Sequence, residues 1–205
     1  NWYYAKWATG QQQVAWDGAK SIWLTGSSLP ASCDKLFTVW QQAGQQNPIT
    51  TLERIRLAMK AGNGSLVNFL AKQLPEDYQT IATAVMDLQN NPANVEAFAR
   101  SVGPTDFTRQ ATLIGFTALA RKDAEAARQM VPSLSQLQKL DEQQAQELKE
   151  AVAWQLMGKD ITSDQARWRD DVVMRTESTT LLERRVRMSL GNNDRRGLNT
   201  WIARL

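Results

Sequence analysis

The stretch "LERIRLAMKAGN" at residues 52–63 decides how this chain folds. Its apolar residues Leu52, Ile55 and Met59 recur at helical spacing and therefore form one stripe along a helix, and the closing Gly-Asn predicts where that helix ends. A similar stretch, "LERRVRMSLGNN", occupies residues 182–193. A hairpin of two such helices cannot bury its apolar stripes alone, so the hairpins must stack on one another.

Comparable stripes recur along the rest of the chain, and no segment has a convincing strand pattern. Each stripe is apolar on one side only, as expected for a helix that packs with one face against its neighbours. The other stripes are Leu36, Val39, Trp40 and Ala43; Tyr78, Ile81, Val85 and Leu88; Phe107, Ala111, Ile114 and Ala118; and Leu148, Val152 and Leu156.

Glycines and capping residues punctuate these stripes at regular intervals, and spacings of 16 to 18 residues between glycines indicate hairpins of about 35 residues. We therefore predict an all-α superhelix, or solenoid, of stacked helical hairpins, with about a dozen helices and no sheet, formed by residues 1–205 as one segment. Helix ends are expected at Gly10, Gly26, Gly44 and Gly62, and helix starts at Asn91–Pro92 and Asp141–Gln144.

Aromatic residues are dense at the start of the chain, where the first 26 residues contain four tryptophans and two tyrosines. Trp16 and Trp23 are seven residues apart and share a helix face, so we predict core positions for them and for Trp40, which follows Cys33, Leu36 and Phe37 on a similar face. The other aromatic residues suit either a core or the wall of a ligand groove, because each has a polar tip; they are Trp2, Tyr3, Tyr4 and Trp7.

Composition indicates an ordinary folded chain. Of 205 residues, 42% are hydrophobic and 22% are charged, which excludes a disordered tail. The apolar run at 111–120 is about half of what a membrane-spanning helix needs, so no membrane span is expected.

Several kinds of catalytic site are excluded by residues that the chain lacks. It has no His, and therefore no imidazole base, imidazole metal ligand or His-paired nucleophile. Its single cysteine, Cys33, cannot form a zinc cluster or a CxxC pair, and no phosphate-binding glycine motif occurs. We expect no catalytic residue, no metal and no cofactor in this chain.

Arginine is concentrated in residues 167–205, which contain nine arginines and five acidic residues. These arginines either form solvated helix faces with local partners, such as Glu183 with Arg187, or bind carboxylates. Binding to nucleic acid is not expected, because the excess is small and no DNA- or RNA-binding motif accompanies it. Four arginines flanking the 191–194 turn are candidate glycan contacts: Arg184, Arg187, Arg195 and Arg196.

The same region contains two apolar stripes and several carboxylates. The stripes are expected to pack on each other, which leaves most of the arginines pointing away from the core. We expect the carboxylates to form structural ion pairs rather than to provide an acid of raised pKa. The stripes are Leu182, Val186 and Leu190, and Leu198, Trp201 and Ile202; the carboxylates are Glu53, Asp170, Asp171 and Glu183.

Long strings of the sequence are not generic helix-repeat consensus. They are "YYAKWATG" at 3–10, "CDKLFTVW" at 33–40, "AVAWQLMG" at 151–158, "WRDD" at 168–171, the stretch at 52–63 and the segment 182–205. Together they resemble the peptidoglycan lytic transglycosylases of Gram-negative bacteria over the full length of the chain.

The resemblance implies a periplasmic enzyme in which a ring-shaped α-superhelix precedes a lysozyme-like catalytic domain. That enzyme cleaves the MurNAc–GlcNAc bond and leaves a 1,6-anhydro end. The family's catalytic domain carries an "ES" glutamate motif together with "GLMQ" and "AYNAG" stretches. We expect none of these three in the chain, so the resemblance assigns it to the superhelical region and gives it no catalytic residue.

We therefore interpret the chain as a non-catalytic scaffold segment, cut at both ends, that supports the catalytic domain and helps to guide glycan strands. The alternative is an α-solenoid that binds a protein partner and has no role in glycan binding. An Arg-rich concave face would favour glycan, and an exposed apolar groove would favour a protein. In an oxidising periplasm Cys33 is either a small buried hydrophobe or half of a disulfide to a residue outside the chain.

Overall fold

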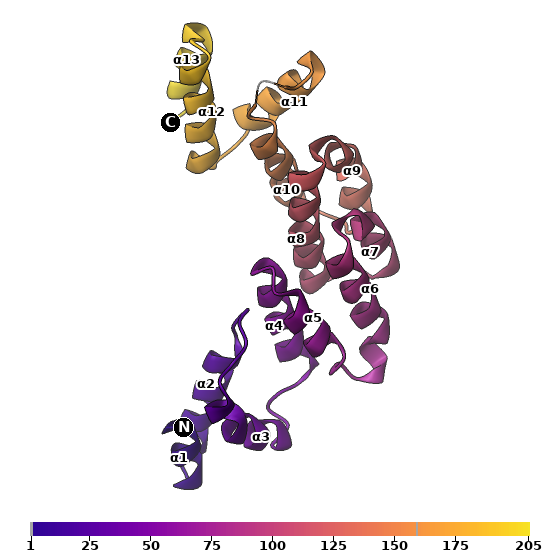
Figure 1. Ribbon diagram of the computed structural model, residues 1–205, viewed down its shortest axis with the longest axis vertical. Helices are drawn as coiled ribbons and strands as arrows, with labels where there is room; N and C mark the ends of the chain where they lie inside the picture. The colour runs from indigo at the N-terminus through magenta and orange to yellow at the C-terminus, as the bar shows by residue number, and fades with distance from the viewer. Residues whose placement is uncertain (1, 159) are drawn as a thin grey trace. The chain divides into compact units, whose positions relative to one another are not determined.

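The computed structural model describes residues 2–158 and 160–205, and the regular secondary structure of those residues is entirely helical (Figure 1). The all-α prediction is therefore confirmed. The α-helices are α1 (Trp2–Ala8), α2 (Gln12–Trp23), α3 (Asp34–Gln42), α4 (Pro48–Lys60), α5 (Gly64–Ala71), α6 (Gln79–Asn90), α7 (Val95–Ser101), α8 (Asp106–Lys122), α9 (Ala124–Leu137), α10 (Glu142–Gln155), α11 (Ser163–Met174), α12 (Thr179–Gly191) and α13 (Arg195–Ile202). Three single-turn 3-10 helices accompany them: η1 (Ala31–Cys33), η2 (Glu76–Tyr78) and η3 (Pro92–Asn94).

The helices form two compact units. Unit 1 comprises Asn1–Asn91 and Thr105–Ala111, and unit 2 comprises Pro92–Pro104 and Thr112–Leu205. In unit 1, α1 packs on α2, α4 on α5 and α5 on α6; in unit 2, α9 packs on α10, α10 on α11 and α12 on α13. Figure 1 shows the pairs α4–α5 and α12–α13 side by side. Helices that are neighbours in sequence thus pair in space, as the hairpin prediction requires.

Three of the four predicted terminal glycines end helices through their backbone conformation. Gly10, Gly44 and Gly62 follow α1, α3 and α4 with φ values of 85°, 72° and 72°, a left-handed region that only glycine enters without strain. Gly26, which follows α2, is required for a different reason. A Cβ atom at this position would lie 2.5 Å from the carbonyl oxygen of Leu57 in α4, so a side chain cannot fit there.

The turn after α12 differs from the turn that its sequence predicts. Gly191 belongs to the helix, and the left-handed residue is Asn193, with a φ of 54°. Asparagine tolerates this conformation better than most residues. Asp194 then caps α13, because its carboxylate oxygen accepts a hydrogen bond of 3.0 Å from the backbone N–H of Gly197.

Capping residues start several helices, and the cap at Asp141–Gln144 is at a predicted place. Asn47 and Thr50 form a reciprocal capping box at α4, and Asp141 and Gln144 form another at α10. Pro92 opens the short turn η3, which leads into α7.

The predicted tryptophan core of unit 1 is confirmed. Trp16, Trp23 and Trp40 retain 7%, 6% and 2% of their surface exposed. The ring of Trp23 lies 5.5 Å from the ring of Phe37 and 5.8 Å from that of Trp40. These aromatic contacts pack α2 against α3.

The C-terminal stripes pack only in part. A cluster in unit 2 buries Leu181, Leu182 and Trp201, and Val186 packs partly buried against it. However, Leu190 is 56% exposed and Ile202 is 50% exposed, so both predicted stripes are wrong at their last residue. These residues lie in or next to the last turns of two helices near the end of the chain, where no further described helix covers them.

The prediction for α8 was only partly right, because Ala111 of the expected stripe is fully buried whereas Phe107, Ile114 and Ala118 are half-buried. Thr108 and Thr112 are fully buried together with Phe116. Threonine hydroxyls in a helix can donate to the preceding turn, so these two positions are polar in sequence yet suited to the interior.

No helix in the described part of the chain combines the length and the apolar character that crossing a bilayer requires.

Candidate functional site

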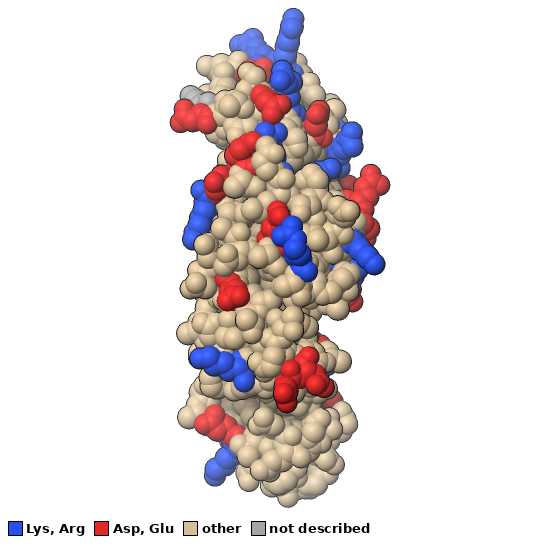
Figure 2. Space-filling view, turned by 90° about the vertical axis from the view of Figure 1, so that its right-hand side faces the viewer, with Lys and Arg blue, Asp and Glu red and all other residues tan. Residues whose placement is uncertain are grey.

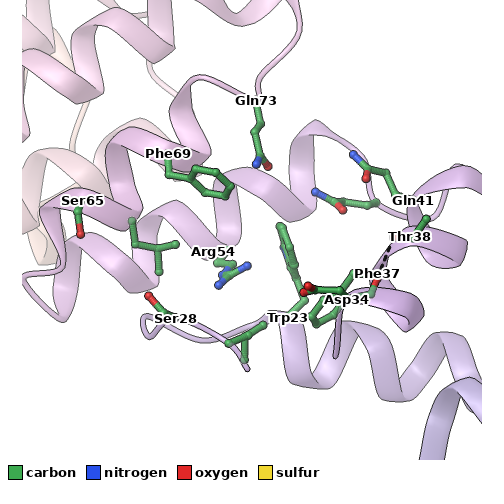
Figure 3. Close-up of a pocket in the computed structure, with 13 residues that line it drawn as sticks. Trp23, Ser28, Asp34, Phe37, Thr38, Gln41, Arg54, Ser65, Phe69 and Gln73 are labelled. Carbon is green, nitrogen blue, oxygen red and sulfur yellow. Dashed lines mark hydrogen bonds between the residues drawn. The ribbon is translucent and has the colours of Figure 1, made fainter. Parts of the chain in front are cut away.

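A groove in unit 1 is the candidate binding site (Figure 3). It encloses about 700 Å³, a size typical of sites for small ligands. Its walls come from α2, α3, α4, α5 and the loop that follows α2. The lining residues are Trp23, Ser28, Leu29, Asp34, Phe37, Thr38, Gln41, Gln46, Arg54, Ser65, Leu66, Phe69 and Gln73.

Arg54 of α4 is the cation of this groove, and its residue is only 4% exposed. Its guanidinium lies 4.2 Å from the ring centroid of Trp23 and donates one hydrogen bond of 3.2 Å to the carbonyl oxygen of Ser27. Its Nε atom is buried and has no hydrogen-bond partner among the described residues. Burial lowers the pKa of the Arg54 guanidinium below its ordinary value, because a charged group loses hydration inside the protein.

Aromatic and amide groups complete the groove. Phe69 of α5 presents an exposed ring, with 60% of its surface accessible, and Phe37 is half-buried. Asp34 is exposed at the start of α3, and the side chains of Gln41 and Gln73 add amide donors and acceptors (Figure 3). The site therefore offers one cation, one carboxylate, apolar ring faces and several neutral hydrogen-bonding groups.

Sequence reasoning missed Arg54, because spacing along one helix does not show which of its arginines is buried. In the structure Arg54 shares a helix face with Thr50, Thr51 and Ala58, all of which are buried. An arginine on the apolar face of a helix is uncommon, since a buried charge needs compensation.

A cluster of buried arginines in unit 2 has a structural role. Asp170 of α11 accepts a hydrogen bond of 2.9 Å from the Nε of Arg169 and another of 2.9 Å from the Nε of Arg185 in α12. Arg169 also donates to the carbonyl oxygen of Leu156, and Arg185 donates to the hydroxyl of Ser189. The two arginines are 4% and 5% exposed, so they are not the solvated residues of a helix face.

The electrostatics of Asp170 follow from these contacts. Burial raises the pKa of the Asp170 carboxyl, but hydrogen bonds and charge from Arg185 and Arg169 outweigh that effect and lower the pKa below its ordinary value. The predicted role of Asp170 in a structural ion pair is confirmed. One of its two partners, Arg169, is adjacent in sequence, whereas the other, Arg185, is 15 residues away.

The four candidate glycan contacts lie in different environments. The guanidinium of Arg184 lies 4.2 Å from the Trp154 ring centroid, and Arg187 pairs with Glu183 at 3.7 Å, as predicted. Arg195 and Arg196 are exposed in the first turn of α13. Figure 2 shows Lys and Arg interspersed with Asp and Glu on the face that it displays, rather than one basic patch. Contact of these four residues with glycan stays a prediction.

Two further sequence features have no catalytic geometry. Cys33 is buried, with 7% of its surface exposed, which fits the interpretation as a small hydrophobe, while the disulfide to a residue outside the chain stays a prediction.

The dipeptide "ES" does occur once, at Glu177 and Ser178, and sequence reasoning overlooked it. There Ser178 caps α12 and Glu177 is exposed. No group of three His, Cys, Asp or Glu side chains in residues 2–158 and 160–205 is placed to hold a metal ion.

Comparisons with known proteins agree with the resemblance seen in the sequence. No family model matches the chain. The soluble lytic murein transglycosylases of Escherichia coli K12 and Salmonella typhimurium are each 62% identical to it over all 205 residues, which cover 32% of the length of those proteins.

Solved structures of such enzymes are similar in fold. The crystal structure of the 70-kDa soluble lytic transglycosylase of Escherichia coli matches all of this chain with a TM-score of 0.93 and 62% identity, over 33% of its own length. An inactive mutant of the lytic transglycosylase Slt of Pseudomonas aeruginosa matches 92% of the chain with a TM-score of 0.74 and 25% identity, over 30% of its own length. Over its whole length, this chain is thus similar to one segment, about a third, of the soluble lytic murein transglycosylases.

Proposed function

We propose that the chain is a non-catalytic scaffold segment of a periplasmic lytic transglycosylase. In this proposal residues 1–205 form one superhelical segment that supports the catalytic domain of the same polypeptide. The complete enzyme cleaves the MurNAc–GlcNAc bond of peptidoglycan and forms 1,6-anhydro-muropeptides during cell-wall turnover. The observation that carries the proposal is the 62% identity over the whole chain to enzymes named for this activity.

The chemistry of the described residues supports a non-catalytic role. Glycosidic cleavage needs a carboxylic acid that stays protonated near neutral pH, and this requires a raised pKa. Instead, the pKa of Glu125 in α9 is lowered to about 2 by hydrogen bonds from Arg128 and Gln165, and that of Asp170 is lowered as well. Both carboxylates are ion-pair partners rather than acids.

A chimera tests the proposal directly. The homologous segment of the Escherichia coli enzyme is replaced by this chain, and release of anhydro-muropeptides from purified sacculi is measured by chromatography and mass spectrometry. At 62% identity most packing positions are matched, so we expect activity within a few-fold of the parent enzyme. The same enzyme with the segment deleted is the comparison, and we expect it to be strongly impaired.

The isolated chain provides the second measurement. Added to sacculi without any other protein, it should release no anhydro-muropeptide. A folded chimera that lacked activity, or cleavage by the isolated chain, would contradict the proposed function.

A further inference from the structure

The groove around Arg54 contains a buried cation that the described protein does not neutralise. Arg54 makes one hydrogen bond to a neutral carbonyl and one contact with an aromatic ring, and it has no ion pair with a described carboxylate. The comparable arginines of unit 2, Arg169 and Arg185, both contact Asp170. A cation held away from water favours an anion that can approach it, since attraction is stronger where water is excluded.

The walls of the groove limit the kind of anion. Asp34 places a negative charge on the same groove, which opposes a ligand with two or more negative charges near it. A ligand that brings one carboxylate to Arg54 and holds its other charged groups away from Asp34 avoids this repulsion, and guanidinium groups bind carboxylates well. Figure 3 shows Arg54 among the lining residues, with Phe69 above it and Asp34 to its right in this view.

The remaining lining groups suit a sugar or a short peptide. The exposed ring of Phe69 offers an apolar face against which a sugar ring or a methyl group can pack. Ser28, Ser65, Gln41 and Gln73 offer hydroxyl and amide groups for neutral hydrogen bonds. A volume of about 700 Å³ accommodates a ligand of two or three such units.

We propose that this groove binds a carboxylate-bearing muropeptide unit, with the ligand carboxylate at Arg54 and its sugar or peptide portion against Phe69. That the carboxylate comes from murein rests on the proposed function. The groove then adds a holding site for the substrate, within unit 1, to a segment that otherwise acts as a scaffold.

Titration of the 205-residue chain by calorimetry tests this proposal. The probe is a GlcNAc–MurNAc-peptide prepared from murein with a muramidase, and chitotetraose serves as the uncharged sugar. We expect the muropeptide to bind, with a dissociation constant below about 1 mM, and chitotetraose to bind at least tenfold more weakly. Equal affinities for the muropeptide and chitotetraose would show that the carboxylate is not recognised and would overturn the proposal. No binding of the muropeptide at 5 mM would overturn it as well.

Variants locate the site. Arg54→Gln removes the cation and should weaken muropeptide binding at least tenfold. Arg56→Gln is the matched control: it makes the same change two residues away in α4, at a residue that lines another part of the surface, and should leave the affinity unchanged. Because Arg54 is buried and its replacement affects packing, Phe69→Ala provides a second test at an exposed side chain.

Phe69→Ala should weaken binding by about threefold to tenfold with no change in the thermal unfolding midpoint. Unchanged affinity in both Arg54→Gln and Phe69→Ala would exclude the groove. Failure of this proposal leaves the chimera active, whereas failure of the proposed function leaves the binding measured on the isolated chain intact, so the two failures are distinguishable.

Discussion

Three buried arginines show that the surroundings of a residue, rather than its type, decide its role. Arg169 and Arg185 are neutralised by Asp170, and their remaining donors contact Leu156 and Ser189. Arg54 is equally buried, yet its Nε has no partner among the described residues. The first pair stabilises the contact of α11 with α12, whereas Arg54 carries a charge that no described carboxylate neutralises.

The Asp170 cluster leads to a prediction about stability. Asp170→Ala leaves two buried guanidinium groups without their carboxylate, so we expect the free energy of unfolding to fall by about 3 kcal/mol. Denaturant titration followed by tryptophan fluorescence measures this change, because Trp201 lies against Arg185.

The adjacent residue supplies the control for this substitution. Asp171 is exposed, and Asp171→Ala should change the free energy of unfolding by no more than about 0.5 kcal/mol. Equal effects of the two substitutions would show that the buried cluster contributes nothing specific.

At the scale of single helices, termini that look alike in sequence differ in backbone conformation. Gly62 ends α4 with a φ of 72°, whereas Gly191 lies inside α12 and leaves the left-handed position to Asn193. The two stretches "LERIRLAMKAGN" and "LERRVRMSLGNN" differ in where the glycine falls relative to the end of the helix: Gly62 follows the last residue of α4 by two positions, whereas Gly191 is the last residue of α12. A pattern of residue types does not resolve such a shift, because the helix end depends on tertiary contacts as well as on capping.

Substitution of these two glycines by alanine should have opposite effects. Gly62→Ala forces a Cβ into the left-handed region and should destabilise the chain by about 1 kcal/mol. Gly191→Ala adds a good helix former where no atom lies within 4 Å of the new Cβ, and should stabilise it by about 0.5 kcal/mol. Calorimetric unfolding of both variants measures these changes, and shifts of the same sign would contradict this account of the two turns.

The helices and much of the core could be predicted from the sequence, because a stripe of apolar residues at helical spacing is buried only if the segment is a helix that packs with this face inward. Trp23 and Trp40 were placed correctly for this reason. Arg54 and Arg185 could not be placed, since their burial depends on partners from other helices, such as Asp170, that spacing along one helix does not reveal. Exposure of Leu190 was missed likewise, because an apolar stripe predicts burial only where another helix covers it.

At the scale of the whole molecule, the two compact units differ in how their charged groups are used. Unit 1 holds the groove with Arg54, which has no ion pair with a described carboxylate, whereas unit 2 contains Glu125 and Asp170, whose pKa values are lowered by arginines. Glu125 accepts from Arg128 in its own helix and from Gln165 in α11, and Arg128 also pairs with Asp164 at 3.0 Å. Acid should therefore weaken unit 2 through these carboxylates.

The pH dependence of stability tests this difference. Glu125 has a pKa of about 2 in the folded chain against an ordinary value of 4.5, so its contribution to stability is complete above about pH 4.5 and is lost as the pH falls toward 2. Since its side chain is 41% exposed, solvent screens the interaction, and we expect a contribution of about 0.5–1 kcal/mol. In calorimetric unfolding, Glu125→Gln should be less stable than the unsubstituted chain at pH 6, and the difference should shrink by pH 3. Glu147→Gln makes the same charge change at an exposed position of α10 and should show no such convergence. A difference between Glu125→Gln and the unsubstituted chain that stayed constant from pH 6 to pH 3 would mean that the carboxylate acts through shape rather than through its charge.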